Sequence, residues 1–325
     1  MKNNIKPVFI FCLPRSGSTL LQRILMGHSK ISSIAEPHFL LPLILATKKE
    51  GTLTKYSHLA SYRGINDMIN NLPDKKNEYY KYLNEFSSNI YNALSKNDSI
   101  YFLDKTPRYV WVIPEIAKIF PEAKFVFLFR NPVQIYASIL TTFSNNRFNK
   151  IYAFYRNMID GNDLLSNGYN LLKSNSYKVN YEELILNPES TIKGLTNFLQ
   201  LEFEEDLSKS FKDQFVKGGS KDPTGINMYE KIDVSPLEKW QELFNTKFRK
   251  RLIRKHTENL NEETLHIQGY SKKKILKEIR QLKTNGKYNL LVDIIDYYYM
   301  KFVLISRINF MFSKNLKWVK GQYLN

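Results

Sequence analysis

A short polar turn near the N-terminus, Arg15-Ser-Gly-Ser-Thr19, has the composition of an anion-binding loop. It follows the apolar run Val8–Leu13 and precedes leucine and isoleucine residues at helical spacing up to Leu25. Backbone N–H groups at a helix start, together with the helix dipole, attract phosphate-like groups. Gly17 lets the backbone approach a ligand closely and Arg15 adds a planar cation, while hydroxyl donors are present on Ser16, Ser18 and Thr19.

A second cation and hydroxyl occur later in the chain. Arg130 follows the apolar run Lys124–Phe129, and Ser138 lies in the helix that Pro132 is expected to begin. A guanidinium and a hydroxyl near a helix start can bind another phosphate. The sequence therefore predicts two separate anion sites, about one hundred residues apart along the chain.

Residues suited to proton transfer follow two further apolar segments. Glu36 comes after Ile31–Ile34 and is the first candidate for a general base, with His38 as the second. Lys105 comes after Ile100–Leu103 and Asp104, where it offers another positive charge.

The turn at Arg15–Thr19 differs from the P-loop of nucleoside-triphosphate enzymes, GxxxxGK[ST]. Aligned on Gly17, that pattern requires glycine at Cys12 and lysine at Ser18, and both are absent. A kinase using ATP and Mg²⁺ nevertheless stays an alternative, because Asp104 after an apolar strand looks like the magnesium-binding carboxylate of such enzymes. The missing lysine argues against this alternative.

Apolar runs that alternate with helical patterns must position these side chains. The pattern predicts an α/β fold with a P-loop-like parallel sheet and helices on both faces. Strands are expected at Val8–Leu13, Ile31–Ile34, Ile100–Leu103, Lys124–Phe129 and Tyr177–Tyr181. Ligands bind at the carboxyl ends of such strands, where all the polar groups above lie.

Composition favours a folded protein with acidic partners or substrates. The 325 residues are 43% hydrophobic and carry a net charge of +17. A single cysteine, Cys12, excludes a disulfide within one chain and suits a reducing compartment. Because the sequence has no eighteen-residue apolar stretch free of charge, we expect no membrane span and a cytoplasmic location.

The C-terminal part differs from the rest in charge. Residues 271–325 contain twelve Lys and Arg but three Asp and Glu, so they hold more than half of the net charge. We expect a core at residues 1–250 and a basic, amphipathic helical extension at 251–325. The segment 271–325 is predicted to dock on the core, to form a homodimer contact, or to lie on an anionic membrane surface.

Several of these motifs resemble those of sulfotransferases that use 3′-phosphoadenosine 5′-phosphosulfate (PAPS). Pro14–Leu21 is similar to their 5′-phosphosulfate loop, and Arg130–Ser138 to their 3′-phosphate segment. Tyr181–Leu184 is similar to a segment near the adenosine, and Asp104–Arg108 looks like bacterial members of the family. The resemblance covers roughly residues 7–245, and it points to the branch that includes protein-tyrosine and heparan sulfotransferases.

The resemblance implies transfer of a sulfuryl group from PAPS to a hydroxyl or amine, releasing adenosine 3′,5′-bisphosphate without a metal. Glu36 would be the general base, Arg15 the loop cation and Lys105 a second cation near the sulfuryl oxygens. Nucleotide contacts are implied for Arg15, Ser16, Gly17, Ser18, Thr19, Arg130, Ser138 and Tyr181, and for a later basic loop with Lys217, Gly218 and Lys221.

The implied acceptor is a small molecule, a lipid or a carbohydrate, and nucleic acid is not expected as a partner. A second alternative is a non-catalytic protein whose basic tail binds membranes or nucleic acid. That alternative predicts binding that depends steeply on salt and is independent of Arg15.

Overall fold

The computed structural model describes residues 5–50, 52, 54, 56–214 and 232–306. Five parallel strands form a central sheet in the order β2-β3-β1-β4-β5. Their bounds are β1 (Lys6–Cys12), β2 (Ile31–Ser33), β3 (Tyr101–Lys105), β4 (Lys124–Phe129) and β5 (Ser176–Asn180). The predicted α/β fold with a parallel sheet is confirmed, and the expected strands occur within two residues of their predicted bounds.

The two faces of the sheet carry different side chains. Along β1, Phe9 and Phe11 point to one face, whereas Val8, Ile10 and Cys12 belong to the hydrophobic cluster of the other. The phenylalanines of β4 join the first face, and the rings of Phe11 and Phe125 stack with centroids 5.8 Å apart. The uninterrupted apolar runs thus become one aromatic and one aliphatic layer, because alternate residues point to opposite faces.

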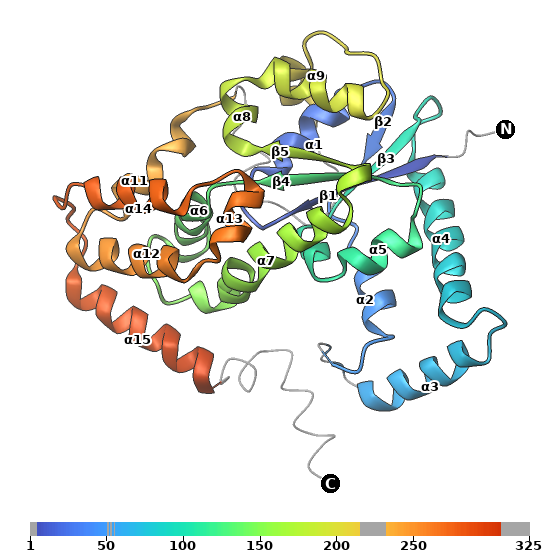
Figure 1. Ribbon diagram of the computed structural model, residues 1–325, viewed down its shortest axis with the longest axis horizontal. Coiled ribbons are helices and arrows are strands. Elements are labelled where there is room, and N and C mark those ends of the chain that lie inside the picture. The colour runs from blue at the N-terminus through green and yellow to red at the C-terminus, as the bar shows by residue number, and fades with distance from the viewer. Residues whose placement is uncertain (1–4, 51, 53, 55, 215–231, 307–325) are drawn as a thin grey trace.

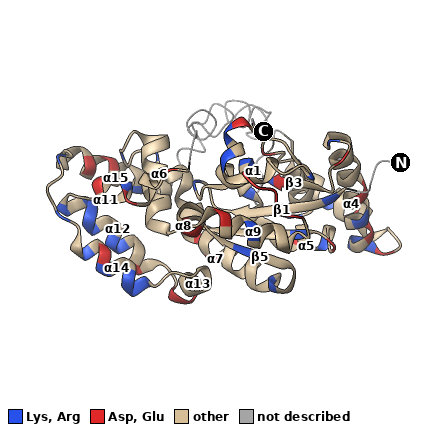
Figure 2. Ribbon diagram, turned by 90° about the horizontal axis from the view of Figure 1, so that it is seen from above, with Lys and Arg blue, Asp and Glu red and all other residues tan. Residues whose placement is uncertain are grey.

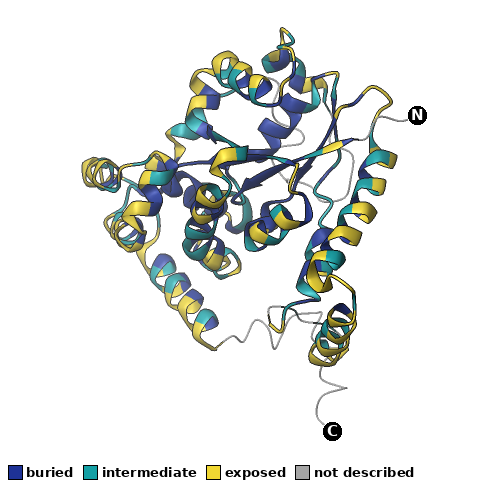
Figure 3. Cartoon of the chain, turned by 45° about the vertical axis from the view of Figure 1, so that its right-hand side comes forward, coloured by how far each residue is buried: buried dark blue, intermediate teal, exposed yellow. Residues whose placement is uncertain are grey.

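Helices cover both layers, as Figure 1 shows for α8 and α9 on one side and α5 and α7 on the other. The aliphatic face packs against α1 (Ser18–Met26), α8 (Tyr181–Leu186), α9 (Pro188–Phe198) and α10 (Leu207–Ser210). The aromatic face packs against α2 (Leu40–Leu45), α4 (Lys75–Leu94), η1 (Pro107–Trp111), α5 (Ile113–Ile119), α6 (Pro132–Ser144), η2 (Ile151–Phe154) and α7 (Tyr155–Leu171). In Figure 3 the sheet is dark with buried residues, and the outward helix surfaces are exposed.

The strand order reverses direction at β1. From β1 the chain passes to β2 and β3 on one side, and then to β4 and β5 on the other. The loops that leave β1 and β4 therefore diverge, which opens a crevice at the carboxyl ends of these two neighbouring strands. This crevice is where the fold can admit a ligand.

Shorter elements complete the described chain. The segment between α2 and α4 contains α3 (His58–Asn70), which packs against α4. Three further 3-10 helices are η3 (Lys173–Asn175), η4 (Phe211–Asp213) and η5 (Ser235–Leu237).

The C-terminal part is helical, as predicted. It comprises α11 (Lys239–Leu243), α12 (Lys247–Asn259), α13 (Glu262–Gln268), α14 (Lys272–Gln281) and α15 (Leu290–Ser306). The division expected after residue 250 falls inside α12. Helix α15 packs against α12 and η2, so the described part of the extension docks on the core.

A buried ion pair fixes α15 to α12. Arg249, which is 1% exposed, donates from Nε and Nη2 to the two carboxylate oxygens of Asp293 at 2.8 and 2.7 Å. The same guanidinium donates to the backbone oxygen of Asn146 at 2.7 Å and lies 3.4 Å from the ring centroid of Tyr288. Bidentate pairing and further partners compensate for removing both charges from water.

Within the described ranges, every helix is too short or too polar to cross a lipid bilayer.

Replacing Asp293 with alanine is expected to destabilise the protein by about 3–5 kcal/mol, since Arg249 would stay buried with its counter-charge removed. The free energy of unfolding can be measured in urea. The matched control is Asp160→Ala, which breaks an exposed pair with Arg156 and should cost less than about 1 kcal/mol. Equal losses for the two variants would contradict the structural role assigned to the buried pair.

Candidate active site

The predicted anion-binding loop connects β1 to α1. Arg15 and Gly17 have left-handed backbone conformations, with φ of 69° and 93°. Helix α1 begins at Ser18, and no side chain among the described residues caps this start. The first N–H groups of the helix are thus available to a ligand in the loop.

Residue 17 must be glycine both because its backbone is left-handed and because no space is left for a side chain. A Cβ atom at this position would lie 2.3 Å from Cδ2 of Tyr181, far inside van der Waals contact. The ring of Tyr181, at the start of α8, therefore packs directly on the loop. This contact depends on the absence of a side chain at residue 17.

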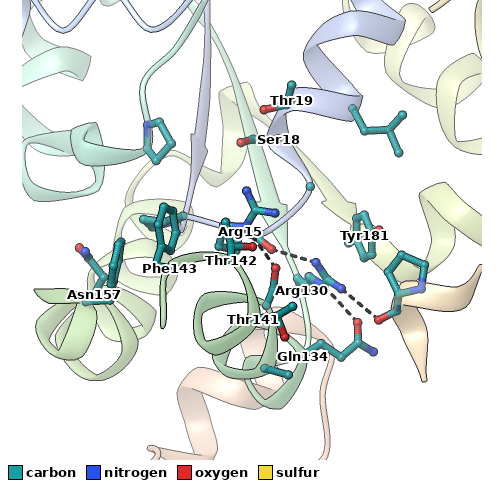
Figure 4. A pocket seen from close by; sticks show the side chains of 18 of the residues that line it. Arg15, Ser18, Thr19, Arg130, Gln134, Thr141, Thr142, Phe143, Asn157 and Tyr181 are labelled. Carbon is teal, nitrogen blue, oxygen red and sulfur yellow. Dashed lines mark hydrogen bonds between the residues drawn. The ribbon is translucent and has the colours of Figure 1, made fainter. Parts of the chain in front are cut away.

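A cavity of about 620 Å³ opens at this loop. Its wall contains most of the residues that the sequence singled out, although they come from four different strand ends. Those residues are Arg15, Gly17, Ser18, Thr19, Glu36, His38, Arg130, Ser138 and Tyr181. Figure 4 shows Arg15 and Arg130 close together beside the loop, with α6 below them.

The two predicted anion-binding segments are in direct contact. Arg15 Nε donates a hydrogen bond to Ser138 Oγ at 3.1 Å, and Arg130 Nη1 donates to the backbone oxygen of Arg15 at 2.9 Å. Ser138 was expected beside Arg130, but its described partner is Arg15. The loop after β1 and the helix after β4 thus form one continuous cationic wall (Figure 4).

Arg130 is held in a fixed orientation and is 7% exposed. Its Nε donates to Gln134 Oε1 at 3.1 Å and its Nη2 donates to the backbone oxygen of Pro236 at 3.2 Å. Its guanidinium also lies 4.1 Å from the ring centroid of Tyr181, a favourable cation–π distance. A cation fixed in this way needs little reorganisation to bind an anion.

Glu36 reaches the cavity wall with a partner on each carboxylate oxygen. Oε1 accepts a hydrogen bond from Lys105 Nζ at 2.8 Å, and Oε2 lies 3.1 Å from His38 Nε2. Burial raises the pKa of Glu36, but the hydrogen bond from His38 and the charge of Lys105 outweigh it. The pKa of Glu36 is therefore lowered overall from its usual value of 4.5, and the carboxylate is ionised at neutral pH.

Lys105 itself is 3% exposed, and its described contact is with Glu36. The structure thus places it behind the candidate base rather than on the cavity wall. His38 lines the cavity with a left-handed backbone, φ 57°, which is unusual for a residue with a side chain.

Asp104 belongs to a buried hydrogen-bond network. Its Oδ2 accepts from the hydroxyls of Tyr91 and Tyr109 at 2.7 and 3.2 Å, and its Oδ1 accepts from Thr106 at 3.0 Å. Burial raises its pKa to about 6 in spite of these hydrogen bonds. The network holds the end of β3, and therefore Lys105, in place.

Of the remaining predicted residues, one is described by the structure and three are not. Ser16 is fully buried and absent from the cavity wall, and its Oγ has no hydrogen-bond partner among the described residues. Lys217, Gly218 and Lys221 lie outside the described residues.

The cavity wall also contains residues to which we assigned no individual role from the sequence. Among them are Arg108, Gln134, Thr141, Thr142, Phe154, Asn157, Lys239 and Trp240. A signal existed in α6, where Gln134, Ser138 and Thr141 or Thr142 recur at helical spacing on an otherwise apolar helix. No comparable pattern marks Lys239 and Trp240, which the fold brings in from α11.

Comparison with known proteins agrees with this geometry. Residues 7–205 match the model of the sulfotransferase family. The chain belongs to the sulfotransferase family. The predicted resemblance to sulfotransferases is confirmed at the level of the family.

Individual relatives are distant. An uncharacterised protein of Aquifex aeolicus (strain VF5) is 24% identical over 246 residues, which cover 73% of this chain and 30% of that protein. Nodulation protein NoeE of Sinorhizobium fredii (strain NBRC 101917 / NGR234) is 28% identical over 146 residues, covering 44% of this chain and 34% of NoeE. The chain thus spans about a third of the length of these two curated relatives.

Among solved structures, the sulfotransferase domain from the curacin biosynthetic pathway has a similar fold. It superposes with a TM-score of 0.50 at 22% identity, over 80% of this chain and all of that domain. This likeness concerns the fold alone.

Gly17→Ala is expected to destabilise the protein by roughly 1–3 kcal/mol, because the new Cβ combines backbone strain with a clash against Tyr181. Gly64→Ala is the matched control. Nothing lies within 4 Å of a Cβ at Gly64, inside α3, so alanine there should stabilise by about 0.4–1 kcal/mol. Urea unfolding of both variants checks the opposite signs, and a stable Gly17→Ala protein would refute the close packing.

Proposed function

We propose that the protein transfers a sulfuryl group from PAPS to a hydroxyl, or less readily an amine, and releases adenosine 3′,5′-bisphosphate. One observation carries the proposal. The loop after β1 and the segment after β4 place Arg15 and Arg130 on the wall of one cavity, in a chain of the sulfotransferase family. PAPS carries phosphate groups on both sides of its ribose, and two adjacent cationic segments suit such a donor.

The loop Arg15–Thr19 would hold the 5′-phosphosulfate through helix N–H groups, and Arg130 with Ser138 would hold the 3′-phosphate. Tyr181 would contact the nucleotide near the adenosine, because its ring lies between Gly17 and Arg130. Ser16 would contribute to the loop through its backbone, because its side chain is buried and does not line the cavity. Lys217, Gly218 and Lys221 keep the role that family resemblance implies, as part of a basic loop near the 3′-phosphate.

Glu36 is our candidate for the general base. Its carboxylate would take the proton of the acceptor hydroxyl while the acceptor oxygen forms a bond to sulfur. The bond from sulfur to the bridging oxygen of the 5′-phosphate then breaks, and that phosphate gains negative charge. Arg15 would stabilise this charge, and catalysis would otherwise rely on aligning the three reacting groups.

Lys105 has two proposed tasks. Its contact with Glu36 at 2.8 Å supports a positioning role, in which it orients the base and keeps it ionised. Family resemblance adds a contact with the sulfuryl oxygens in the loaded enzyme.

The kinase alternative is not favoured by the structure. Asp104, which suggested it, uses both carboxylate oxygens in hydrogen bonds to three hydroxyl groups. Ser18 occupies the position where a kinase loop has lysine.

The acceptor would be a small molecule, a lipid or a carbohydrate. The cavity wall offers Phe143, Phe154 and Trp240 as apolar surface, and Arg108 and Lys239 as further cations. Such a mixed wall suits an acceptor with both apolar and polar parts.

Calorimetry with adenosine 3′,5′-bisphosphate tests the nucleotide site. Saturable binding at micromolar concentration is expected, and Arg130→Ala should weaken it about 10- to 100-fold, the effect of losing a charge-assisted contact. Arg156→Ala, which removes an arginine with a 76% exposed side chain on α7, is the matched control and should bind normally. The absence of saturable binding by the unmodified protein would rule out PAPS as donor.

The base assignment is tested with Glu36→Gln. We expect transfer of labelled sulfate from PAPS into a metabolite extract of the source organism to fall about 10²- to 10⁴-fold, while bisphosphate binding persists. Glu258→Gln, which alters an exposed glutamate of α12, should leave transfer unchanged. Mass spectrometry of the sulfated product measures the rate, and normal turnover by Glu36→Gln would show that another group is the base.

A further inference from the structure

Helix α15 presents an exposed apolar face. Seven large hydrophobic residues of this helix are exposed, from 50% at Tyr299 to 83% at Ile305. They are Leu290, Leu291, Ile295, Tyr298, Tyr299, Phe302 and Ile305. Their spacing places them on one side of the helix. An apolar surface this continuous is unusual on a protein that contacts only water.

The inward face of α15 carries its two acidic residues. Asp293 and Asp296 are buried, and they accept bidentate hydrogen bonds from Arg249 and Arg147 respectively. Met300 and Val303 are buried on the same side. The helix is therefore held to the core partly by ion pairs, while most of its large apolar side chains point outward. This is the reverse of an ordinary surface helix.

The surroundings of α15 are basic. Residues 247–306 contain 14 Lys and Arg but 6 Asp and Glu, and two of those acids are the buried Asp293 and Asp296. Figure 2 shows the blue segments along α12 and α14. Exposed cations on these two helices and on the segment leading to α15 are Lys247, Arg251, Arg254, Lys255, Lys273, Lys274, Lys277, Arg280, Lys283 and Lys287.

The exposed side of α15 itself carries a positive charge, Lys301, and no acidic residue within the described part of the helix. A second copy of the chain would bring the same net charge of +17 and the same Lys301 to the contact, so like charges would meet. An anionic lipid surface has the opposite charge and an apolar interior. Tyr298 and Tyr299 also suit the boundary between headgroups and acyl chains.

We propose that α15 lies in the plane of an anionic membrane surface, with Leu291, Ile295, Phe302 and Ile305 inserted among the lipids. The basic helices α12 and α14 would add long-range attraction to the headgroups. The occupant of the apolar face is thus a lipid surface, and the ion pairs of the buried Asp293 and Asp296 hold α15 in the orientation that presents this face.

Vesicle flotation with the full chain tests the proposal. The protein should float with phosphatidylcholine vesicles containing about 30% phosphatidylserine, and bind pure phosphatidylcholine at least about tenfold more weakly, because anionic headgroups attract the basic helices. Raising the salt to about 0.5 M should reduce flotation. The double variant Ile295→Asp with Phe302→Asp should lose binding, and both positions are exposed, so the fold should persist in a circular dichroism melt.

Leu171→Asp is the matched control, since Leu171 is 60% exposed at the end of α7, and this variant should float like the unmodified chain. Two results would overturn the proposal. One is that the double variant still floats with the vesicles, or that the unmodified chain does not float with them. The other is a dimer, seen by light scattering, that the double variant dissociates without any vesicle binding, which would assign the face to a second copy.

Discussion

The site depends on a hydrogen bond between two segments that are 115 residues apart in sequence, from Arg130 to the backbone oxygen of Arg15. It can form because β1 and β4 are neighbours in the sheet and both end at the same edge. The left-handed conformations of Arg15 and Gly17 turn the loop toward Arg130, and Tyr181 closes on the glycine. The sheet order thus converts two distant motifs into one cationic wall.

The strands and the loop were predictable because their signals are local. A strand buried on both faces reads as an apolar run, and Arg15–Thr19 stands out by composition. Contacts between residues that depend on tertiary packing left no such local signal in the sequence. Ser138 was assigned to Arg130 from spacing, whereas its observed donor, Arg15, depends on how α6 rotates against the loop. Lys239 and Trp240 enter the cavity only because the chain returns to the site after residue 231.

Buried charge has different roles in the two halves of the molecule. At the site, Lys105 and Glu36 form a pair that reaches the cavity, so an incoming anion can act on it. Between the core and the extension, Arg249 and Asp293 are sealed from solvent and pair with each other. Counting charges revealed the excess of positive charge in residues 271–325. It did not reveal that the acidic residues of α15 face inward. Burial alone distinguishes a structural pair from one that a ligand can perturb.

The paired state of Glu36 bears on how the proposed reaction would begin. A carboxylate whose pKa is lowered by Lys105 and His38 is ionised but weakly basic. A bound nucleotide would bring several negative charges into the same cavity and exclude water from it. Both effects raise the pKa of a nearby carboxyl group, because a like charge and desolvation each disfavour its ionised form. Binding of the donor would therefore strengthen the base at the moment when the acceptor proton must be removed.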